Sequence, residues 1–293
     1  MPDRGSRSLR TLRASSGARV GTVILVVVGV CAMAPHLLAP FDPTEQRLLA
    51  RFTPPFTRAV DGTLAVLGTD QLGRDILSRL IYGARTSSLI GFAAVLLAGF
   101  TGTALGLLAG VRGGMSDHAV MRLADMQLAF PFILLAITVI GILGPSIRNL
   151  ILVVGLSNWA AYARVVRAET LAVRERPYVE AARSLGLRAP RIVLRYILPN
   201  VGASLIVVAT FGIAGAILTE AGLSFLGLGV PVAIPTWGGM LAEGRQYVDT
   251  RYWLALFPGA ALFMTVMAIN LVGDTLRDTL DPYLHVRRSL EQL

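Results

Sequence analysis

Side chains that commonly act in catalysis or bind metal ions are few in this sequence and lie far apart. The three histidines, His36, His118 and His285, lie far apart, and Cys31 is the only cysteine. The sequence has no paired-carboxylate pattern and no HExxH, which would place two zinc ligands on one helix face. All 27 Lys or Arg positions are arginine, so the chain lacks the lysine that a P-loop places on the phosphates of ATP. We therefore predict that this chain is not an enzyme and that it has no catalytic residues, no metal site and no cofactor.

The composition is that of a membrane protein. Of 293 residues, 54% are hydrophobic and 15% are charged, and the mean hydropathy is +0.64. These values are too apolar for a soluble domain and predict an all-α integral membrane protein in contact with lipid. A net charge of +9 could indicate a nucleic-acid partner. We predict none, because membrane orientation explains arginines beside apolar runs better.

The most distinctive stretch is polar and arginine-rich but lies between two apolar runs. It reads YVEAARSLGLRAPRIVLRYILPN and covers 178–200. Its composition predicts a helix over 178–185 that ends at Gly186. Pro190 can begin a second short helix, which we expect to stop before Pro199.

The first of these helices has a narrow apolar stripe. Ala181, Ala182 and Leu185 fall at i, i+1 and i+4, beside Glu180 and Arg183. A short helix of this kind, located outside the membrane, is suited to binding in a groove of another protein. The alternative is an ordinary amphipathic helix in a loop between two spans.

These residues resemble a known motif. Glu180-Ala181-Ala182, Gly186 and Leu198-Pro199-Asn200 are similar to the EAA loop of permease subunits of ABC importers. In that family the loop docks into a groove of a cytoplasmic ATPase, so the resemblance implies a coupling role. The glutamate would fix the docking angle, the alanines would allow close approach, the glycine would permit the turn, and the Pro-Asn pair would anchor the loop to the next span. The coupling residues implied are Glu180, Ala181, Ala182, Leu185, Gly186, Pro199 and Asn200. Tyr196 departs from the family pattern, in which histidine is common there, and we expect no change of role.

A wider resemblance covers nearly the whole chain after residue 20. Several short motifs are similar to C-type permeases of dipeptide, oligopeptide and nickel importers. They are Gly68-Thr69-Asp70, Gly73-Arg74-Asp75, Ser78-Arg79, Gly83-Ala84-Arg85, Gly273-Asp274, Leu276-Arg277-Asp278 and Leu280-Asp281-Pro282. The resemblance implies that the chain forms half of a translocation pathway for peptides. The implied partners are a second permease in a heterodimer, two ATP-binding-cassette subunits or domains and an extracytoplasmic solute-binding protein.

Two alternatives remain for the transported solute and the mechanism. Nickel or another small solute is one, because the solute-binding protein largely selects the cargo in this family. The sequence shows no His or Met cluster suited to a metal path, which favours peptides. A stand-alone secondary transporter is the remote alternative. It would need an internal repeat or charges near the membrane midplane, where Glu220 is the one plausible candidate.

Six apolar runs predict six transmembrane helices, since about 20 helical residues cross the ~30 Å hydrocarbon core. The predicted spans are 20–38, 86–111, 126–144, 150–163, 201–219 and 252–273. We divide the chain into a cytoplasmic tail (1–19), the first span (20–38), an extracytoplasmic loop (39–85), a five-helix permease core (86–283) containing the coupling loop (168–200), and a cytoplasmic tail (284–293). A cleaved signal peptide is the alternative for the first span, but its apolar run continues past Pro35.

The arginines orient these spans. Eighteen of the 27 fall in segments that are cytoplasmic when both termini are inside, which agrees with the positive-inside rule. The predicted orientation therefore has both termini and the coupling loop in the cytoplasm, and the family resemblance implies the bacterial cytoplasmic membrane.

Finer patterns give local expectations. Ile76, Leu80 and Ile81 predict a separate amphipathic helix at the membrane surface, which steadies the extracytoplasmic face or has a substrate role. Arg122 and Asp125, at i and i+3, are placed to form an ion pair. Small residues at close spacing predict tight helix packing in the second span, and these are Gly99, Gly102, Gly106 and Gly110.

Polar residues within the apolar runs are candidates for the pathway or a gate. These are Glu220, Ser224 and Asn270. An acidic side chain that faced lipid would be costly, so Glu220 is expected to face the bundle interior or a water-filled cavity. Structural pairing and gating are both open for it. Glycines and prolines after 219 predict a partly buried outer loop that reaches Trp237.

Overall fold

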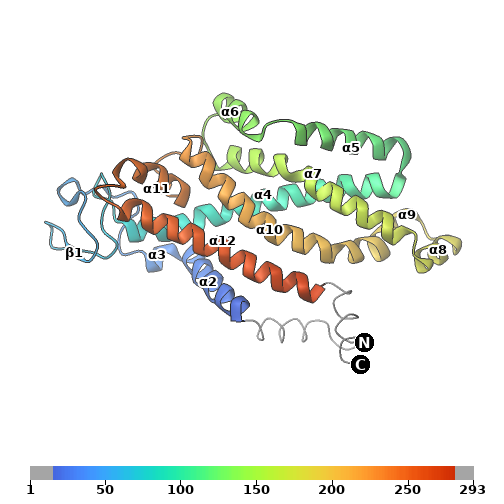
Figure 1. The fold of residues 1–293 in the computed structure, drawn as a ribbon, viewed down its shortest axis with the longest axis horizontal. Coiled ribbons are helices and arrows are strands. Elements are labelled where there is room, and N and C mark those ends of the chain that lie inside the picture. The colour runs from blue at the N-terminus through green and yellow to red at the C-terminus, as the bar shows by residue number, and fades with distance from the viewer. Residues whose placement is uncertain (1–15, 281–293) are drawn as a thin grey trace.

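The computed structural model describes residues 16–280. The expected tail 284–293 and most of the tail 1–19 lie outside the described residues. Four long helices run alongside one another: α4 (Ile76–Arg112), α7 (Ile147–Arg174), α10 (Leu198–Phe225) and α12 (Trp253–Leu280) (Figure 1). Helix α2 (Ser16–Met33) packs across α12 and α4.

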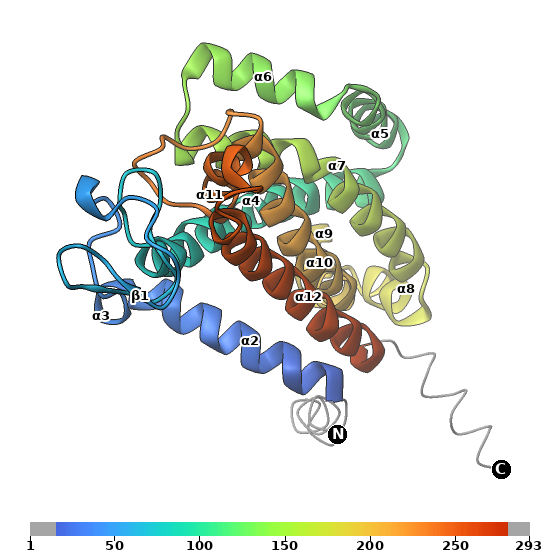
Figure 2. The same ribbon diagram turned by 60° about the vertical axis from the view of Figure 1, so that its left-hand side comes forward.

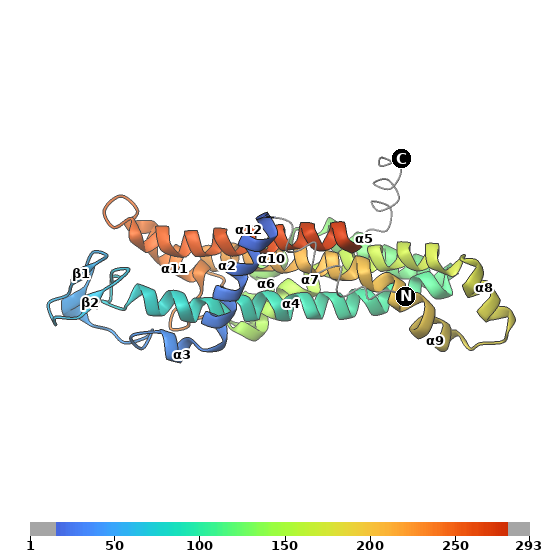
Figure 3. The same cartoon turned by 90° about the horizontal axis from the view of Figure 1, so that it is seen from below.

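Short elements lie at the two ends of this bundle (Figures 1 and 3). The hairpin end carries α3 (Pro35–Leu38), η1 (Leu48–Ala50), β1 (Thr57–Arg58), β2 (Leu64–Ala65), α11 (Trp237–Gly244) and η3 (Arg245–Tyr247). Strands β1 and β2 are antiparallel, with Thr57 opposite Ala65 and Arg58 opposite Leu64. The coupling-loop end carries α8 (Pro177–Ser184), α9 (Ala189–Ile192) and η2 (Val193–Ile197).

Five of the six predicted spans are single long apolar helices, and the third is broken. Five helices are long and apolar enough to cross a membrane, and a sixth span exists if α5 (Gly114–Ala129) and α6 (Phe132–Leu143) count as one. These two helices are bent by 86° at their junction, so the prediction of a single helix over 126–144 is wrong. The cause is Pro131, which lacks an N–H and disfavours helical geometry at Phe130, whose backbone is extended. Figure 2 shows α5 and α6 on the opposite side of the bundle from α2.

The predicted surface helix at 76–81 is also wrong, because it forms the first turns of α4. Asp75 caps this helix, its carboxylate accepting a hydrogen bond from the backbone N–H of Ser78 at 2.8 Å. No proline interrupts the sequence from that cap to Arg112. A single 37-residue helix is about 55 Å long, which is well over the ~30 Å needed to cross the hydrocarbon core.

The fourth and fifth spans are longer than predicted. Helix α7 continues past 163 to Arg174, and α10 continues past 219 to Phe225. The chain also stays helical through Pro199, where we expected a stop. Pro199 lies in the first turn of α10, where a missing N–H is tolerated, and the five-residue π-helix η2 joins α9 to it.

Close packing of α4 on α7 confirms the role predicted for the small residues. A Cβ built on Gly102 would lie 2.5 Å from the Trp159 carbonyl oxygen, and one on Gly106 would lie 2.6 Å from the Ala163 carbonyl oxygen. The same holds at Gly110, where a Cβ would lie 2.7 Å from the Thr170 side chain. The contact at Gly99 is looser, at 3.8 Å from the Tyr162 ring.

Two ion pairs fasten α5 to α7. Arg167 binds both carboxylate oxygens of Asp117, and its NH2 atom lies 2.6 Å from Oδ2. Arg164 binds Asp125 at 2.6 Å. The predicted pairing of Asp125 with Arg122 is therefore wrong, because the partner comes from the neighbouring helix rather than from the same one.

Candidate functional site

The coupling loop is shaped by the end of α8. Gly186 has a φ of +78°, and its N–H donates to the Arg183 carbonyl at 3.0 Å. The Leu187 N–H donates to the Ala182 carbonyl at 3.2 Å. These two bonds form a Schellman motif, which closes a helix with a left-handed residue and favours glycine there. The helix predicted over 178–185 is confirmed to within one residue at each end.

The inner face of α8 is fixed to the bundle. Val179 and Ala182, one turn apart, are buried, and Val179 packs in a cluster with Val173 of α7, Ile192 of α9 and Ile197 of η2. This contact attaches the short helix rigidly to the ends of the spans on either side. Ala182 therefore faces the loop's own core, and the predicted stripe of Ala181, Ala182 and Leu185 is divided between two faces.

The outer face of α8 carries a different stripe. Tyr178, Ala181 and Leu185 occur at i, i+3 and i+7, which places them on one side of the helix. All three are exposed, Tyr178 by 40% and Leu185 by 80%. We name these three residues the outer stripe. Tyr178 had no functional assignment from the sequence, although its spacing from Ala181 was the available signal.

Beyond α9, the chain is tied into α10 by residues around η2. The rings of Tyr196 and Tyr178 lie 6.3 Å apart between centroids, so the tyrosine that departs from the family pattern packs on α8. The Asn200 side-chain amide donates to the Tyr196 carbonyl at 2.6 Å. Pro199 and Asn200 are exposed and lie where η2 joins α10.

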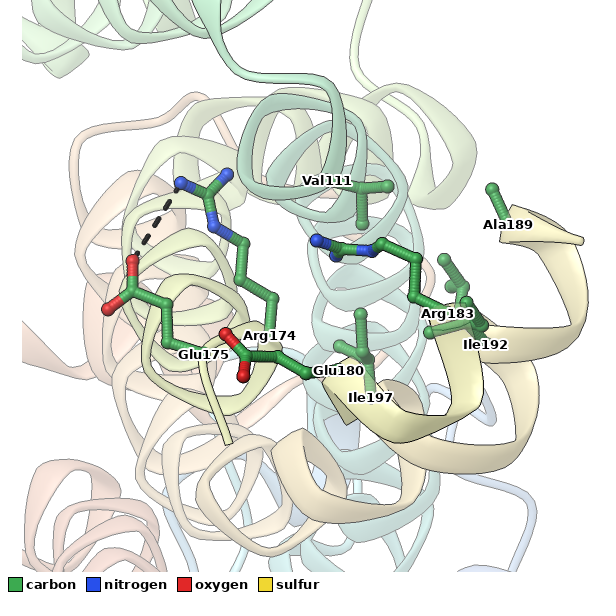
Figure 4. A pocket seen from close by; sticks show the side chains of 9 residues that line it. Val111, Arg174, Glu175, Glu180, Arg183, Ala189, Ile192 and Ile197 are labelled. Carbon is green, nitrogen blue, oxygen red and sulfur yellow. Dashed lines mark ion pairs between the residues drawn. The ribbon is translucent and has the colours of Figure 1, made fainter. Parts of the chain in front are cut away.

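A groove of about 510 Å³ lies beside α8, next to the ends of α4 and α7 (Figure 4). Charged residues line its rim, and apolar residues of α4, α9 and η2 line the rest. The lining residues are Val111, Arg174, Glu175, Glu180, Arg183, Ala189, Ile192, Val193 and Ile197. Glu180 thus projects into this groove, on a different side of α8 from the outer stripe.

The candidate gate residues do not form one site. Glu220 of α10 is fully buried and accepts hydrogen bonds from the Ser224 hydroxyl at 2.7 Å and the Ser87 hydroxyl at 3.2 Å. Ser87 in turn accepts a bond from the Trp237 backbone N–H at 3.2 Å. Glu220 therefore faces the protein interior, as expected, and joins α4, α10 and the start of α11. Asn270 of α12 makes no hydrogen bond to this group within residues 16–280.

An ionic cluster holds the hairpin end together. Arg79 binds Asp70 at 2.6 Å and Glu243 at 2.7 Å, and Arg74 binds the same two carboxylates. We name these four residues the outer network. It joins the loop before α4, α4 itself and α11, which supports the steadying role considered for this segment. Glu243 had no sequence signal, because nothing near it in the sequence indicates its distant arginine partners.

The outer network sets the ionisation of Glu243. Burial raises the pKa of this carboxyl, but the hydrogen bond and charge of Arg79 and the charge of Arg74 outweigh burial and hold the pKa below its ordinary value. Two guanidinium groups and two carboxylates leave the cluster balanced, as a buried ionic site requires. Within the described part of the chain, no group of three or more His, Cys, Asp or Glu residues could hold a metal ion.

The long apolar helices define a class of protein: a multi-pass membrane protein. Residues 102–286 match the family described as "Binding-protein-dependent transport system inner membrane component", and this chain belongs to that family. Residues 4–55 match the N-terminal transmembrane domain of oligopeptide transport permease C.

Characterised relatives resemble the chain over most of its length. The di/tripeptide transport system permease protein DppC of Pseudomonas aeruginosa is 42% identical over 270 residues, covering 92% of this chain and 89% of the relative. The nickel transport system permease protein NikC of Escherichia coli is 40% identical, covering 91% and 94%. In fold, the chain is similar to a chain of the inward-facing methionine ABC transporter MetNI, with a TM-score of 0.55 and 20% identity over 69% of this chain and 96% of that one.

Proposed function

We propose that this chain is the permease subunit of an ATP-driven peptide importer and that the outer stripe is its docking surface for a cytoplasmic ATPase. The relatives named for dipeptide transport support the substrate class. The observation that carries the coupling role is the division of α8 into two faces. Val179 is packed into the bundle, whereas Leu185, the residue that follows the last turn of α8, is exposed.

This arrangement can transmit motion. Movement of the ATPase would push on the outer stripe, and the packed inner face would carry the displacement to α7 and α10 without much deformation. Glu220 lies near the far end of α10, so tilting of that helix would act on its contacts with Ser87 and Ser224. Solute access would thereby change at the hairpin end.

The proposal includes the partners and the location. A second permease subunit would complete the pathway, two ATP-binding-cassette subunits would hydrolyse ATP, and a solute-binding protein would deliver peptide at the hairpin end. The chain would lie in the bacterial cytoplasmic membrane with both termini and the coupling loop on the cytoplasmic side. This chain would itself supply no catalytic group.

The test replaces Leu185 in the assembled transporter. Leu185→Asp should abolish ATP-dependent uptake of a labelled dipeptide and release the ATPase subunits during purification, because a carboxylate cannot occupy an apolar docking surface without cost. Val60→Asp is the matched control, since Val60 is exposed in the loop at the hairpin end, outside the predicted spans. Normal uptake and normal ATPase retention by Leu185→Asp would contradict the proposal.

The substrate class is tested in the same preparation. Unlabelled dipeptides and tripeptides should compete with the labelled dipeptide, whereas nickel ions should not. ATP-dependent nickel uptake that peptides do not inhibit would support the alternative represented by the Escherichia coli relative.

A further inference from the structure

Two exposed arginines converge on a single aromatic ring at the hairpin end. The guanidinium carbon of Arg51 lies 5.7 Å from the centre of the Phe52 ring, and that of Arg251 lies 5.6 Å from the same centre. The Phe52 N–H donates to the Asp70 carbonyl at 3.1 Å, and its ring packs 5.0 Å from that of Tyr247. The loop before α4 and the residues leading into α12 therefore each bring one positive charge to a fixed ring.

No carboxylate of residues 16–280 forms an ion pair with either guanidinium. Asp249 lies only two residues before Arg251 but does not pair with it. The Arg251 guanidinium donates to the Thr250 carbonyl at 3.0 Å. Other arginines at the hairpin end do have carboxylate partners, and these are Arg47, Arg74 and Arg79. Two like charges beside one ring repel each other, so an anion held between them would be stabilised.

The arginine pair lies at one boundary of a membrane span. The sequence between Arg251 and Asp274 contains 22 residues without a formal charge. As a helix, such a run covers about 33 Å, which matches the ~30 Å hydrocarbon core. Arg251 is therefore placed at the level of the lipid headgroups, and it is followed by Tyr252, a residue type enriched at that level. Since Arg51 contacts the same ring, it lies at that level too.

An apolar stripe runs along α12 from the arginine pair into the span. Tyr252, Leu256 and Phe263 occur at i, i+4 and i+11, and Tyr252 joins the helix through its carbonyl, which accepts from the Leu256 N–H at 2.9 Å. The three residues are exposed by 59%, 53% and 66%. They cover about 16 Å along the helix axis, which is close to half of the ~30 Å hydrocarbon core. The stripe therefore lies in the leaflet that borders the arginine pair.

We infer that the arginine pair and the stripe bind one phospholipid, with its phosphate between Arg51 and Arg251 and an acyl chain along α12. Guanidinium groups suit phosphate oxygens, and the exposed stripe suits a hydrocarbon chain. Because no acid neutralises the pair, a lipid with net negative charge, such as phosphatidylglycerol, is preferred to the net-neutral phosphatidylethanolamine. A lipid bound there would fasten the loop before α4 to the start of α12. This inference goes beyond the proposed function and requires only that α12 crosses the membrane.

The first test counts bound lipid on the assembled transporter after purification and delipidation in detergent. Phosphatidylglycerol is added back, and native mass spectrometry gives the number of bound molecules at each concentration. The double variant Arg51→Gln with Arg251→Gln should bind one molecule fewer than the natural complex. Each single variant should raise the half-saturating concentration for that molecule at least about tenfold, as expected for loss of a charged hydrogen bond. Equal binding by the natural complex and the double variant would overturn the inference.

Matched controls separate this site from general attraction to charge. Arg245→Gln removes an exposed arginine that lies 5.2 Å from the centre of the Phe225 ring without a second arginine beside it, and should bind the same number of lipids as the natural complex. Glycerol 1-phosphate carries the phosphate without acyl chains and should not displace the lipid at equal concentration. Displacement by glycerol 1-phosphate, or an equal loss of lipid in Arg245→Gln, would overturn the inference.

A second test measures whether the lipid joins the two segments. Phosphatidylglycerol should raise the thermal unfolding midpoint of the natural protein more than phosphatidylethanolamine does. The rise should be smaller in the double variant, whereas Arg51→Lys, which keeps the charge but not the planar fork, should lie between the two. Equal rises in the natural protein and the double variant would overturn the inference whatever the binding assay shows.

Discussion

Gly186 defines the end of α8 by its backbone conformation rather than by its contacts. A Cβ built there meets no atom within 4 Å, yet φ is +78°. A β-branched side chain in this conformation costs about 1–2 kcal/mol, whereas asparagine tolerates it. Gly186→Val should therefore reduce ATP-dependent uptake strongly and leave membrane insertion intact, and Gly186→Asn should retain most uptake. The measurements are labelled-dipeptide uptake and the amount of chain in the membrane.

The control for this prediction is Gly202→Ala. Gly202 also has open space around it, but its φ is not left-handed. Equal uptake by Gly186→Val and Gly202→Ala, at equal expression, would show that the turn does not matter for coupling.

Glu243 makes the stability of the hairpin end depend on pH. Its pKa is lower in the folded protein, so the outer network stabilises the fold fully above the unfolded value of about 4.3. That stability is lost as pH falls from there through the folded pKa. Thermal unfolding in detergent should show a steeper decline between about pH 5 and pH 3 for the natural protein than for Glu243→Gln.

The same variant gives the size of the effect at neutral pH. Removing one member of a buried ionic cluster leaves arginine charge uncompensated and costs about 3 kcal/mol. About 3 kcal/mol is the lower end of the cost expected for breaking a buried ion pair, and it applies here because the Glu243 side chain is 16% exposed. An unfolding curve of Glu243→Gln that matches the natural protein at pH 7 would show that the arginines find other partners.

At the scale of elements, the packing of α4 on α7 should tolerate Gly99→Ala but not Gly102→Ala. Gly102→Ala would place a methyl group 2.5 Å from a backbone oxygen of Trp159, which cannot rotate away. Such overpacking costs about 1–3 kcal/mol. Gly99→Ala makes an ordinary contact with Tyr162 at 3.8 Å and should be neutral. Thermal unfolding of the two purified variants checks this, and equal midpoints would contradict it.

The sequence predicted helices better than their junctions. Apolar runs located the six spans because lipid requires about 20 apolar residues in each helix. The sequence pattern did not predict the 86° bend at Pro131 or the π-helix before Pro199. A proline is compatible with a break, a bend or the first turn of a helix. Which of these occurs depends on packing against neighbouring helices.

The candidate site was predicted to a similar extent. Gly186 was identifiable because a helix end favours glycine for a local reason. The inward position of Ala182 and the partnership of Glu243 with Arg79 depend on distant segments, so a single sequence could not reveal them. Helical spacing located Ala181 and Leu185 on the helix but did not show which face the bundle would cover.

At the scale of the whole molecule, the proposed coupling surface and the outer network lie at opposite ends of the bundle (Figure 1). Helices α7 and α10 run between the two regions and flank the coupling loop. An importer of this design needs the two ends on opposite sides of the membrane. Orientation is therefore the property on which the coupling mechanism depends.

Orientation can be tested with single cysteines in a Cys31→Ser background. Val60→Cys, at a position 81% exposed at the hairpin end, should react with a membrane-impermeant maleimide added to intact spheroplasts. Arg188→Cys should react only after permeabilisation, because the arginine distribution predicts a cytoplasmic coupling loop. Ala136→Cys, at a buried position, should stay unlabelled and controls for unfolding. If Arg188→Cys reacted in intact spheroplasts and Val60→Cys did not, the ATPase could not reach the outer stripe from the cytoplasm and the proposed coupling mechanism would fail.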